Sequence, residues 1–275
     1  FCAAMERRLA VPTAIAAGCD IFLFNKDLDE DIRFMKEGIA NGILTPERID
    51  EAVTRILAMK AALHLPEKQT EARLVPPKED LAVLKGEKHV EWAKQAADNG
   101  ITLVKDTADN LPLRPEATPR LLLQVIGPYE EANTQITSTV IPLLEKAGFR
   151  VTLYQPEDFT TGFESVSQFR SKYDAVLYLA NVENRSNATT TRINWYTFFG
   201  LGNNIPWFVD EVPTVFASLG NPYHLMDVPM VKTYINTYDN HQAVIEALVA
   251  KILGKSDFKG VSPIDPYCGL MDARR

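Results

Sequence analysis

Short apolar runs alternate with segments of helical periodicity from residue 120 onward, and this alternation constrains the fold more than any other feature. The run at residues 174–180 (DAVLYLA) has the continuous apolar character of a strand buried on both faces. Strands that alternate with helices are joined by right-handed crossovers, so the pattern predicts an α/β sandwich of Rossmann-like type with a mostly parallel sheet. The expected strands are residues 121–126, 150–154, 174–180, 212–218 and 231–236, and the expected helices are residues 133–147, 164–172 and 240–253.

Residues 93–113 (AKQAADNGITLVKDTADNLPL) join two parts of the chain with different patterns. A helix is expected up to residue 99, and Gly100 is the residue type that ends a helix with a positive φ. A β-rich run at residues 101–104 follows directly. Further along, helices are expected to end at Gly148 and Gly254, and Asn240 is expected to cap the last helix. The chain after the junction, about residues 86–275, reads as a complete domain.

Residues 1–65 carry a helix–strand–helix–helix pattern that buries little by itself. The apolar run at residues 19–24 (CDIFLF) predicts a buried strand, while Asp27 and Thr45 are expected to cap the two following helices. One strand cannot form a sheet, so this part is expected to pack on other material. Residues 66–85, rich in proline and charge, predict an extended linker.

Composition excludes several classes of protein. The chain has 275 residues, of which 46% are hydrophobic and 24% charged, with a net charge of −7. Lys and Arg are dispersed, so no nucleic-acid surface is expected, and no apolar run approaches the ~20 residues that cross a bilayer. The cysteines, Cys2, Cys19 and Cys268, are scattered, which favours reduced thiols but leaves a single external disulfide open.

The thiols favour a cytoplasmic location. The first residues (FCAAMERRL) read as the middle of a helix without an initiator Met, so we expect the chain to be a piece of a longer protein, and a secreted protein or a lipoprotein stays open.

Common catalytic motifs are absent. Gly200 and Gly202 lack the third glycine and the strand-to-helix turn of a dinucleotide site, and Ser218 lacks the glycines of a nucleophile elbow. The histidines have no ligand spacing among themselves or with the cysteines, so neither a metal nor a cofactor is expected. They are His64, His89, His224 and His241.

Two loops that follow expected strands are candidates for contacts with substrate. The loop at residues 181–191 follows the most buried strand, where parallel sheets place their ligands. Its candidates for hydrogen bonds to a polar substrate such as a sugar are Glu183, Asn184, Arg185 and Asn187. Asn184 and Asn187 also begin glycosylation sequons, a pattern that often occurs by chance. The alternative to a binding role is a solvated crossover loop.

The second loop, residues 220–224 (GNPYH), also follows a strand. Its candidates are Tyr223 and His224, but a structural role, in which the two side chains plug a contact between domains, is the favoured interpretation because polar loop residues are common without function.

Several separated motifs resemble family 3 glycoside hydrolases. AAGCDIFLF, DLDE and LTPERIDEAVTRILAMKAALHL resemble the last strand, its helix and the closing helix of that family's (β/α)₈ barrel, and residues 93–113 resemble the entry into its second domain. SLGNPYHL, VKTYINTY and GKSDFKGVSP continue the resemblance in family order. The subgroup most similar is that of the bacterial β-N-acetylhexosaminidases of N-acetylglucosaminidase type. The resemblance therefore implies that residues 1–65 are a barrel remnant, residues 66–85 a linker and residues 86–275 the second domain.

The resemblance implies a retaining mechanism on terminal β-linked N-acetylglucosamine-type sugars. In that subgroup the nucleophile is an Asp on the preceding barrel strand and the acid/base is an Asp–His pair on an earlier barrel loop. No residue of this chain matches either motif, so we expect this piece to be structural and catalytically silent, with the carbohydrate bound through the barrel. In the β-glucosidase branch a Glu of the second domain is the acid; the matching position here carries Asn181, and Glu183 lies two residues away as the catalytic candidate.

Three alternatives stay open at this level. They are a β-glucosidase-type parent with Glu183 as acid/base, a phosphorylase of the same fold, and a non-catalytic α/β module that binds a small ligand or a protein.

Overall fold

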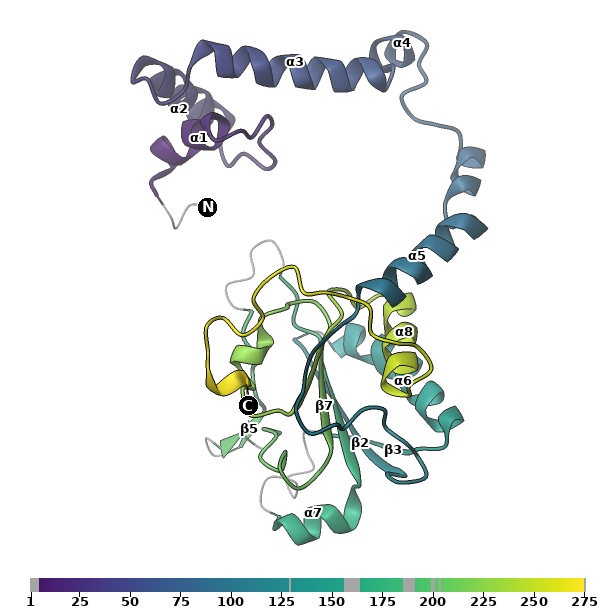
Figure 1. Ribbon diagram of the computed structural model, residues 1–275. Helices are drawn as coiled ribbons and strands as arrows, with labels where there is room; N and C mark the ends of the chain where they lie inside the picture. Colours follow the sequence, from purple (N-terminus) through teal and green to yellow (C-terminus); the bar gives the residue numbers. More distant parts are fainter. Residues whose placement is uncertain are drawn as a thin grey trace. The chain divides into compact units, whose positions relative to one another are not determined.

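The computed structural model describes residues 5–128, 130–155, 164–184, 191–198, 201–202 and 204–274. The chain divides into two compact units, Phe1–Val83 and Leu84–Arg275, and each is described by itself (Figure 1).

The first unit is helical in its described part. Asp27 and Thr45 cap two of its helices as predicted: the Asp27 carboxylate accepts from the N–H of Glu30 at 2.8 Å, and the Thr45 hydroxyl accepts from the N–H of Arg48 at 3.2 Å. The elements are α1 (Arg7–Ala16), α2 (Leu28–Ala40), α3 (Pro46–Ala62), α4 (Leu65–Thr70) and the 3₁₀ helix η1 (Lys78–Val83). Because α4 and η1 lie within or overlap residues 66–85, that segment is not extended throughout.

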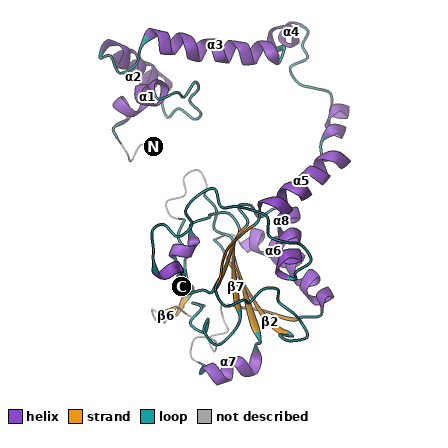
Figure 2. Ribbon diagram, viewed as in Figure 1, coloured by secondary structure: helices purple, strands orange, loops and turns teal. Residues whose placement is uncertain are grey.

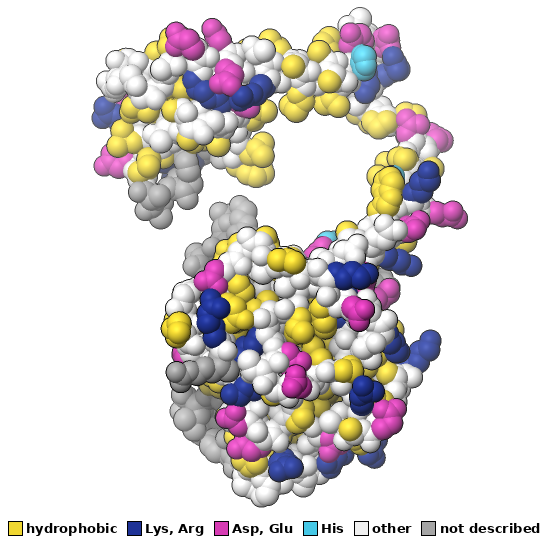
Figure 3. Space-filling view, in the orientation of Figure 1, with side chains coloured by type: hydrophobic (Ala, Val, Ile, Leu, Met, Phe, Trp, Pro, Cys, Tyr) yellow, Lys and Arg dark blue, Asp and Glu magenta, His cyan; other side chains and the backbone are white. Residues whose placement is uncertain are grey.

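The prediction of a strand at residues 19–24 is wrong. These residues form turns and irregular structure, with Leu23 77% and Phe24 93% exposed. A strand needs neighbours for its backbone N–H and C=O groups, and the described residues of this unit contain no other strand. Hydrophobic side chains also lie exposed along α3 (Figure 3). Val53 and Leu57 of this helix are 44% and 58% exposed.

The second unit contains a mixed sheet of six strands in the order β1-β8-β7-β4-β2-β3. Every neighbouring pair is parallel except β1 and β8, which confirms the predicted α/β fold with a mostly parallel sheet. The strands are β1 (Thr102–Asp106), β2 (Arg120–Ile126), β3 (Arg150–Leu153), β4 (Ala175–Ala180), β7 (Thr214–Ser218) and β8 (Thr233–Asn236). The helices are α5 (Glu87–Gly100), α6 (Glu130–Ala147), α7 (Val166–Lys172) and α8 (Gln242–Ile252), with the 3₁₀ helices η3 (His224–Met226) and η4 (Asp272–Arg274).

Both faces of the sheet are covered. Alternate residues of β2 serve different layers: Leu121 and Leu123 belong to the core shared with α5, α6 and α8, whereas Leu122 belongs to the core shared with α7 and irregular segments. Figure 2 shows the strands between these helices. Every residue of β4 is buried, as a central strand covered on both faces requires.

Helix ends agree with the glycine pattern at two of the three predicted positions. Gly148 (φ 110°) and Gly254 (φ 68°) follow the ends of α6 and α8 as predicted, and both have a positive φ. Gly100 does not: α5 includes it, and Ile101 continues in extended conformation directly toward β1. The chain passes from helix to strand without a left-handed residue, so the prediction for Gly100 is wrong.

Asn240 does not cap α8. The N-cap residue is His241, one position later, and it has no side-chain cap; the Asn240 amide donates to other partners, which are described below. The segment with Gly202 forms a hairpin of two short strands, β5 (Thr197–Phe198) and β6 (Leu201–Gly202), which the sequence did not predict. Gly200 lies outside the described residues.

Candidate functional site

The order of the strands creates a crevice between β2 and β4. The chain leaves β2 through α6 toward β3 on one side, whereas it leaves β4 toward β7 on the other side. In open α/β sheets, ligands bind outside the carboxyl ends of the strands at such a switch point. The residues that follow β2 and β4 therefore form the candidate site, and they begin with Gly127 and Asn181.

Asn181 is buried at the end of β4, with 2% of its surface exposed. Its amide donates to Oδ1 of Asn133 on α6 at 3.1 Å, and the Asn133 amide donates to the carbonyl oxygen of Gly127 at 3.0 Å. A Cβ on Gly127 would lie 2.6 Å from the Asn181 carbonyl oxygen, so only glycine fits here. These contacts hold the ends of β2 and β4 and the first turns of α6 in one arrangement.

Asn240, in the loop after β8, extends this network. Its amide donates to Oδ1 of Asn181 at 2.9 Å and also to Oε1 of Glu183. Glu183 is half-buried, and its Cγ lies 3.0 Å from the position that a Cβ on Gly220 would take. The network of Asn133, Asn181, Glu183 and Asn240 therefore joins α6 with the loops that follow β4 and β8 into one polar edge, and the loop that follows β7 packs closely against Glu183.

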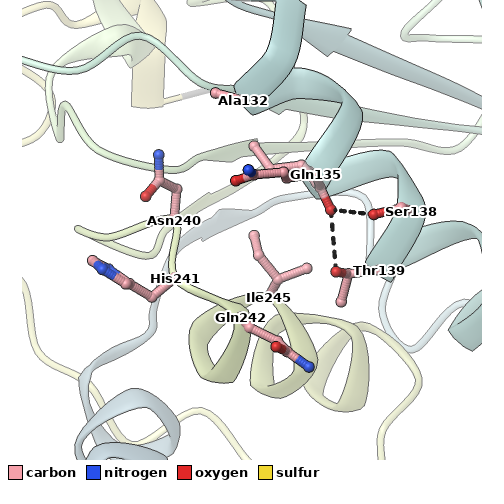
Figure 4. Close-up of a pocket in the computed structure, with 9 residues that line it drawn as sticks. Ala132, Gln135, Ser138, Thr139, Asn240, His241, Gln242 and Ile245 are labelled. Atoms are coloured by element: carbon pink, nitrogen blue, oxygen red, sulfur yellow. Dashed lines mark hydrogen bonds between the residues drawn. The ribbon is translucent and has the colours of Figure 1, made fainter.

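A polar groove of about 410 Å³ lies beside Asn240, between α6 and the start of α8 (Figure 4). Gln135 of α6 points toward the side of the groove that Asn240 forms, and His241 and Gln242 line the groove at the start of α8. Asp239 holds the ring of His241, whose Nδ1 lies 2.5 Å from the carboxylate. Burial by itself would raise the pKa of Asp239, but hydrogen bonds from the His241 ring and from the backbone N–H groups of Asn240 and His241 outweigh it and lower that pKa.

His224 is fully buried, and its ring holds three segments together. Nδ1 lies 2.9 Å from the Ser218 hydroxyl, and Nε2 lies 2.7 Å from the carbonyl oxygen of Thr191 and 3.2 Å from the Asn221 amide. Burial lowers the pKa of His224, so the neutral ring is favoured. Such a ring serves to pack the interior, in line with a structural role, whereas Tyr223 is 41% exposed.

The loop candidates fall into two groups. Glu183 joins the polar edge, and Asn184 is exposed. Arg185 and Asn187 lie outside the described residues, so their contact with a sugar stays a prediction.

Two residues of the polar edge, Asn133 and Asn240, were missed as site residues. The signal was present for Asn240, an Asn in a loop after a strand of a parallel sheet, but its position before a helix favoured a capping role.

The chemistry available at this edge is that of amides and one carboxylate. An amide neither ionises nor delivers a proton near neutral pH, so Asn181 cannot act as a general acid or base. Amide and carboxylate groups do bind sugar hydroxyls. Within the part of the chain that the structure describes, no group of His, Cys, Asp and Glu could hold a metal ion, and no helix is long and apolar enough to span a bilayer. Cys19 and Cys268 are exposed free thiols, and Cys2 lies outside the described residues.

Comparison with known sequences finds relatives, although no protein-family model matches the chain. The chain is 43% identical, over 274 residues, to the "Beta-N-acetylglucosaminidase/beta-glucosidase" of Cellulomonas fimi, a match that covers 98% of this chain and 48% of that protein. An exo-1,4-β-xylosidase of Aspergillus niger is 26% identical over 195 residues, which are 63% of this chain and 24% of that protein.

Comparison with solved structures also finds a relative of about 40% identity along nearly the whole chain. "Beta-glucoside phosphorylase BglX" is 41% identical with a TM-score of 0.72, covering 99% of this chain and 48% of that one. A glycoside hydrolase family 3 β-N-acetylglucosaminidase from Paenibacillus sp. str. FPU-7 has a TM-score of 0.52 at 19% identity, covers 92% of this chain and 46% of that one, and shows the shared fold alone. The chain thus spans about half the length of the curated Cellulomonas relative and of the phosphorylase.

Proposed function

This chain belongs to glycoside hydrolase family 3, and we propose that it is part of a retaining β-glycosidase that removes terminal β-linked N-acetylglucosamine or glucose residues. The observation that carries the proposal is the 43% identity, along 98% of the chain, to a relative whose name contains both activities. N-acetylglucosamine is the favoured substrate, on the motifs that resemble the N-acetylglucosaminidase subgroup. The compartment stays a prediction.

In this proposal the chain itself is catalytically silent. A retaining mechanism needs two groups flanking the scissile bond, commonly carboxyl groups roughly 5 Å apart, one as nucleophile and one as acid/base. The residue directly after β4 is Asn181, which can do neither, and Glu183 already accepts a hydrogen bond from Asn240. The polar edge then serves to hold the loops that follow β4, β7 and β8, and the loop at residues 181–191 contributes contacts to the sugar.

Phosphorolysis is the second candidate, because a structure 41% identical to this chain is described as a beta-glucoside phosphorylase. In a retaining phosphorylase, a phosphate oxygen replaces water in the second step: it bonds to the anomeric carbon as the bond from that carbon to the enzyme carboxylate breaks. The product is a sugar 1-phosphate instead of the free sugar.

The test compares this chain with the full-length gene product on chromogenic β-N-acetylglucosaminide and β-glucoside, each with and without inorganic phosphate. We expect activity only in the longer protein. Release of sugar 1-phosphate that depends on phosphate would select the phosphorylase, and release of free sugar the hydrolase. Inactivity of both proteins would contradict the proposal and favour a binding module.

A Glu183→Gln variant of the longer protein tests the remaining catalytic candidate. If Glu183 were the acid/base, kcat would fall by about 10²–10⁴-fold. We expect a change of less than about tenfold. Replacing Arg185 and Asn187 tests the loop separately, and an unchanged KM would remove its contact with the sugar.

A further inference from the structure

A second cleft lies at the same edge of the sheet, on the face away from α6 and α8. Its aromatic part, of about 370 Å³, is lined by Tyr154, Trp195 and Tyr196 together with Asn194 and Asn204. An adjoining cavity of about 510 Å³ shares Ile126, Gly127 and Asn194 with it. Both volumes are within the range of about 300–1,000 Å³ typical of ligand sites.

The segment that carries Asn194 and Trp195 has no regular secondary structure, yet it is held at both ends. On one side, the N–H of Ile193 donates to Asp227 at 3.3 Å, and Arg192 forms an ion pair with the same carboxylate. On the other side, the N–H of Tyr196 donates to Oδ1 of Asn204 at 2.9 Å. The segment is therefore fixed by its neighbours.

The second of these anchors is connected to the centre of the sheet. Tyr178 of β4 donates from its hydroxyl to the carbonyl oxygen of Asn204 at 3.0 Å, and the same hydroxyl accepts from the amide of Gln124 of β2 at 3.0 Å. Tyr178 and Gln124 are both buried. A wall supported in this way is preorganised, which lowers the entropy cost of binding.

Asn194 and Trp195 present groups that suit a sugar. The Asn194 amide and the Trp195 indole N–H have no hydrogen-bond partner among the residues that the structure describes. Asn194 is exposed and Trp195 is half-buried. The described residues that line the aromatic part include no charged side chain. An uncharged ligand with an apolar face and hydroxyl or acetamido groups at its rim matches this lining.

We propose that this cleft binds a pyranose ring of a β-linked oligosaccharide, which stacks on Trp195 and hydrogen-bonds to the Asn194 amide. The choice of a β-linked glucose or N-acetylglucosamine unit rests on the proposed function, whereas the cleft and its lining do not. The acetamido group of N-acetylglucosamine would add a methyl group for the aromatic side chains and a carbonyl oxygen for the indole N–H.

The test titrates the 275-residue chain with N,N′-diacetylchitobiose and, separately, with cellobiose, and follows the heat of binding by isothermal titration calorimetry, which does not need Trp195 as the reporter. We expect a saturable change with at least one disaccharide, and tighter binding of chitobiose if the acetamido group is recognised. Trp195→Ala should weaken binding by about fivefold or more, because stacking is lost. The matched control is Trp92→Ala, since Trp92 is 58% exposed on α5 and should leave the affinity unchanged.

Asn194→Ala is a second variant that does not depend on the packing around Trp195. Its exposed side chain makes no hydrogen bond to the described residues, so the variant should fold normally and bind both disaccharides more weakly. Absence of saturable binding by the wild-type chain, or binding that survives unchanged in both variants, would overturn the proposal.

These outcomes differ from those of the proposed function. If the longer protein is active while this chain binds neither disaccharide, the proposed sugar site in the cleft is refuted and the proposed glycosidase activity stands. Trp195-dependent binding by this chain together with an inactive longer protein would do the reverse.

Discussion

At the scale of single residues, the polar edge depends on donors and acceptors that match one another. Asn240 supplies one NH₂ group to two acceptors, Oδ1 of Asn181 and Oε1 of Glu183. Loss of a partner from a buried polar group costs more than the mean value of a hydrogen bond, because the group left behind stays desolvated. The effect of a substitution at this edge on the free energy of unfolding should therefore depend on whether it only removes the donor or also adds a negative charge.

Asn240→Asp should destabilise the chain more than Asn240→Ala does. Both variants lose the donor, at a cost of about 1–3 kcal/mol, but the aspartate also places a carboxylate against Glu183. Urea unfolding at pH 7 measures both. Gln242→Ala, at an exposed position two residues away, is the control and should change the free energy of unfolding by less than about 0.5 kcal/mol. An aspartate variant as stable as the alanine variant would contradict this view of the site.

The burial of His224 predicts that the stability of the chain depends on pH. Its pKa is lowered by burial in the folded chain, so as the pH falls the unfolded chain, with a histidine pKa near 6.5, binds the proton first. The contribution of His224 to the free energy of unfolding is therefore fully present above about pH 6.5 and decreases as the pH falls from there through the folded-state pKa.

The measurement is the free energy of unfolding from pH 8 to pH 5 for the wild type, His224→Gln and His89→Gln. His224→Gln should be less stable at pH 8 but should show a flatter profile. His89 is exposed on α5, so its variant should keep the slope of the wild type. A His224→Gln profile parallel to that of the wild type would refute the assignment.

At the scale of elements, close approaches of backbone decide which glycines matter. A Cβ on Gly260 would lie 2.4 Å from the carbonyl oxygen of Gly100 and 2.5 Å from that of Ile101. The chain near residue 260 thus packs directly on the junction between α5 and β1. Gly100 itself has open space around its Cβ position.

Gly260→Ala should therefore destabilise the chain by about 1–3 kcal/mol through overpacking against backbone. Gly100→Ala is its matched counterpart and should be neutral or stabilising by up to about 1 kcal/mol, since alanine is favoured over glycine in a helix. Thermal or urea unfolding of the two variants gives the comparison. A larger loss for Gly100→Ala than for Gly260→Ala would show that the sequence-based view of Gly100 was the better one.

At the scale of the whole molecule, the two units differ in how much they bury. The second contains two apolar cores, one on each face of a sheet whose central strand β4 is wholly buried. In the first, the buried residues of α2 are Asp31, Phe34 and Gly38, and α3 buries Ala52. Local stability follows burial and contact with a core, so the units should open independently.

Hydrogen exchange of the intact chain should show this difference. We expect the slowest amides in β4, β7 and α8, and fast exchange in α2 and α3, where the helices lack a core of comparable size. Protected helices in residues 1–65 together with unprotected strands in residues 120–250 would overturn the expectation. Tests on the longer protein then show whether the exposed face of α3 becomes protected there.

Hydrophobic periodicity along the sequence was sufficient to predict the main strands and helices of the sheet domain. Hydrophobic spacing is a local property, so it predicted β2, β4, α6 and α8 within a few residues, and the alternation of strand and helix predicted parallel pairing. It failed at residues 19–24, because an apolar run becomes a strand only when another strand supplies hydrogen-bond partners. The predictions that Asp27 and Thr45 cap helices were correct, because capping depends on neighbours only three residues away.

The tertiary structure alone decided which residues meet at the site. Asn181 bonds to Asn133, 48 positions away, and to Asn240, 59 positions away, because the strand order places the ends of β2, β4 and β8 at one edge. The sequence determined by itself that Asn181 follows a buried strand and that Glu183 is close to it. The sequence could not show that the Asn240 amide donates to both Asn181 and Glu183 and that Asn240 does not cap α8. Only the folded sheet brings these two acceptors within reach of Asn240.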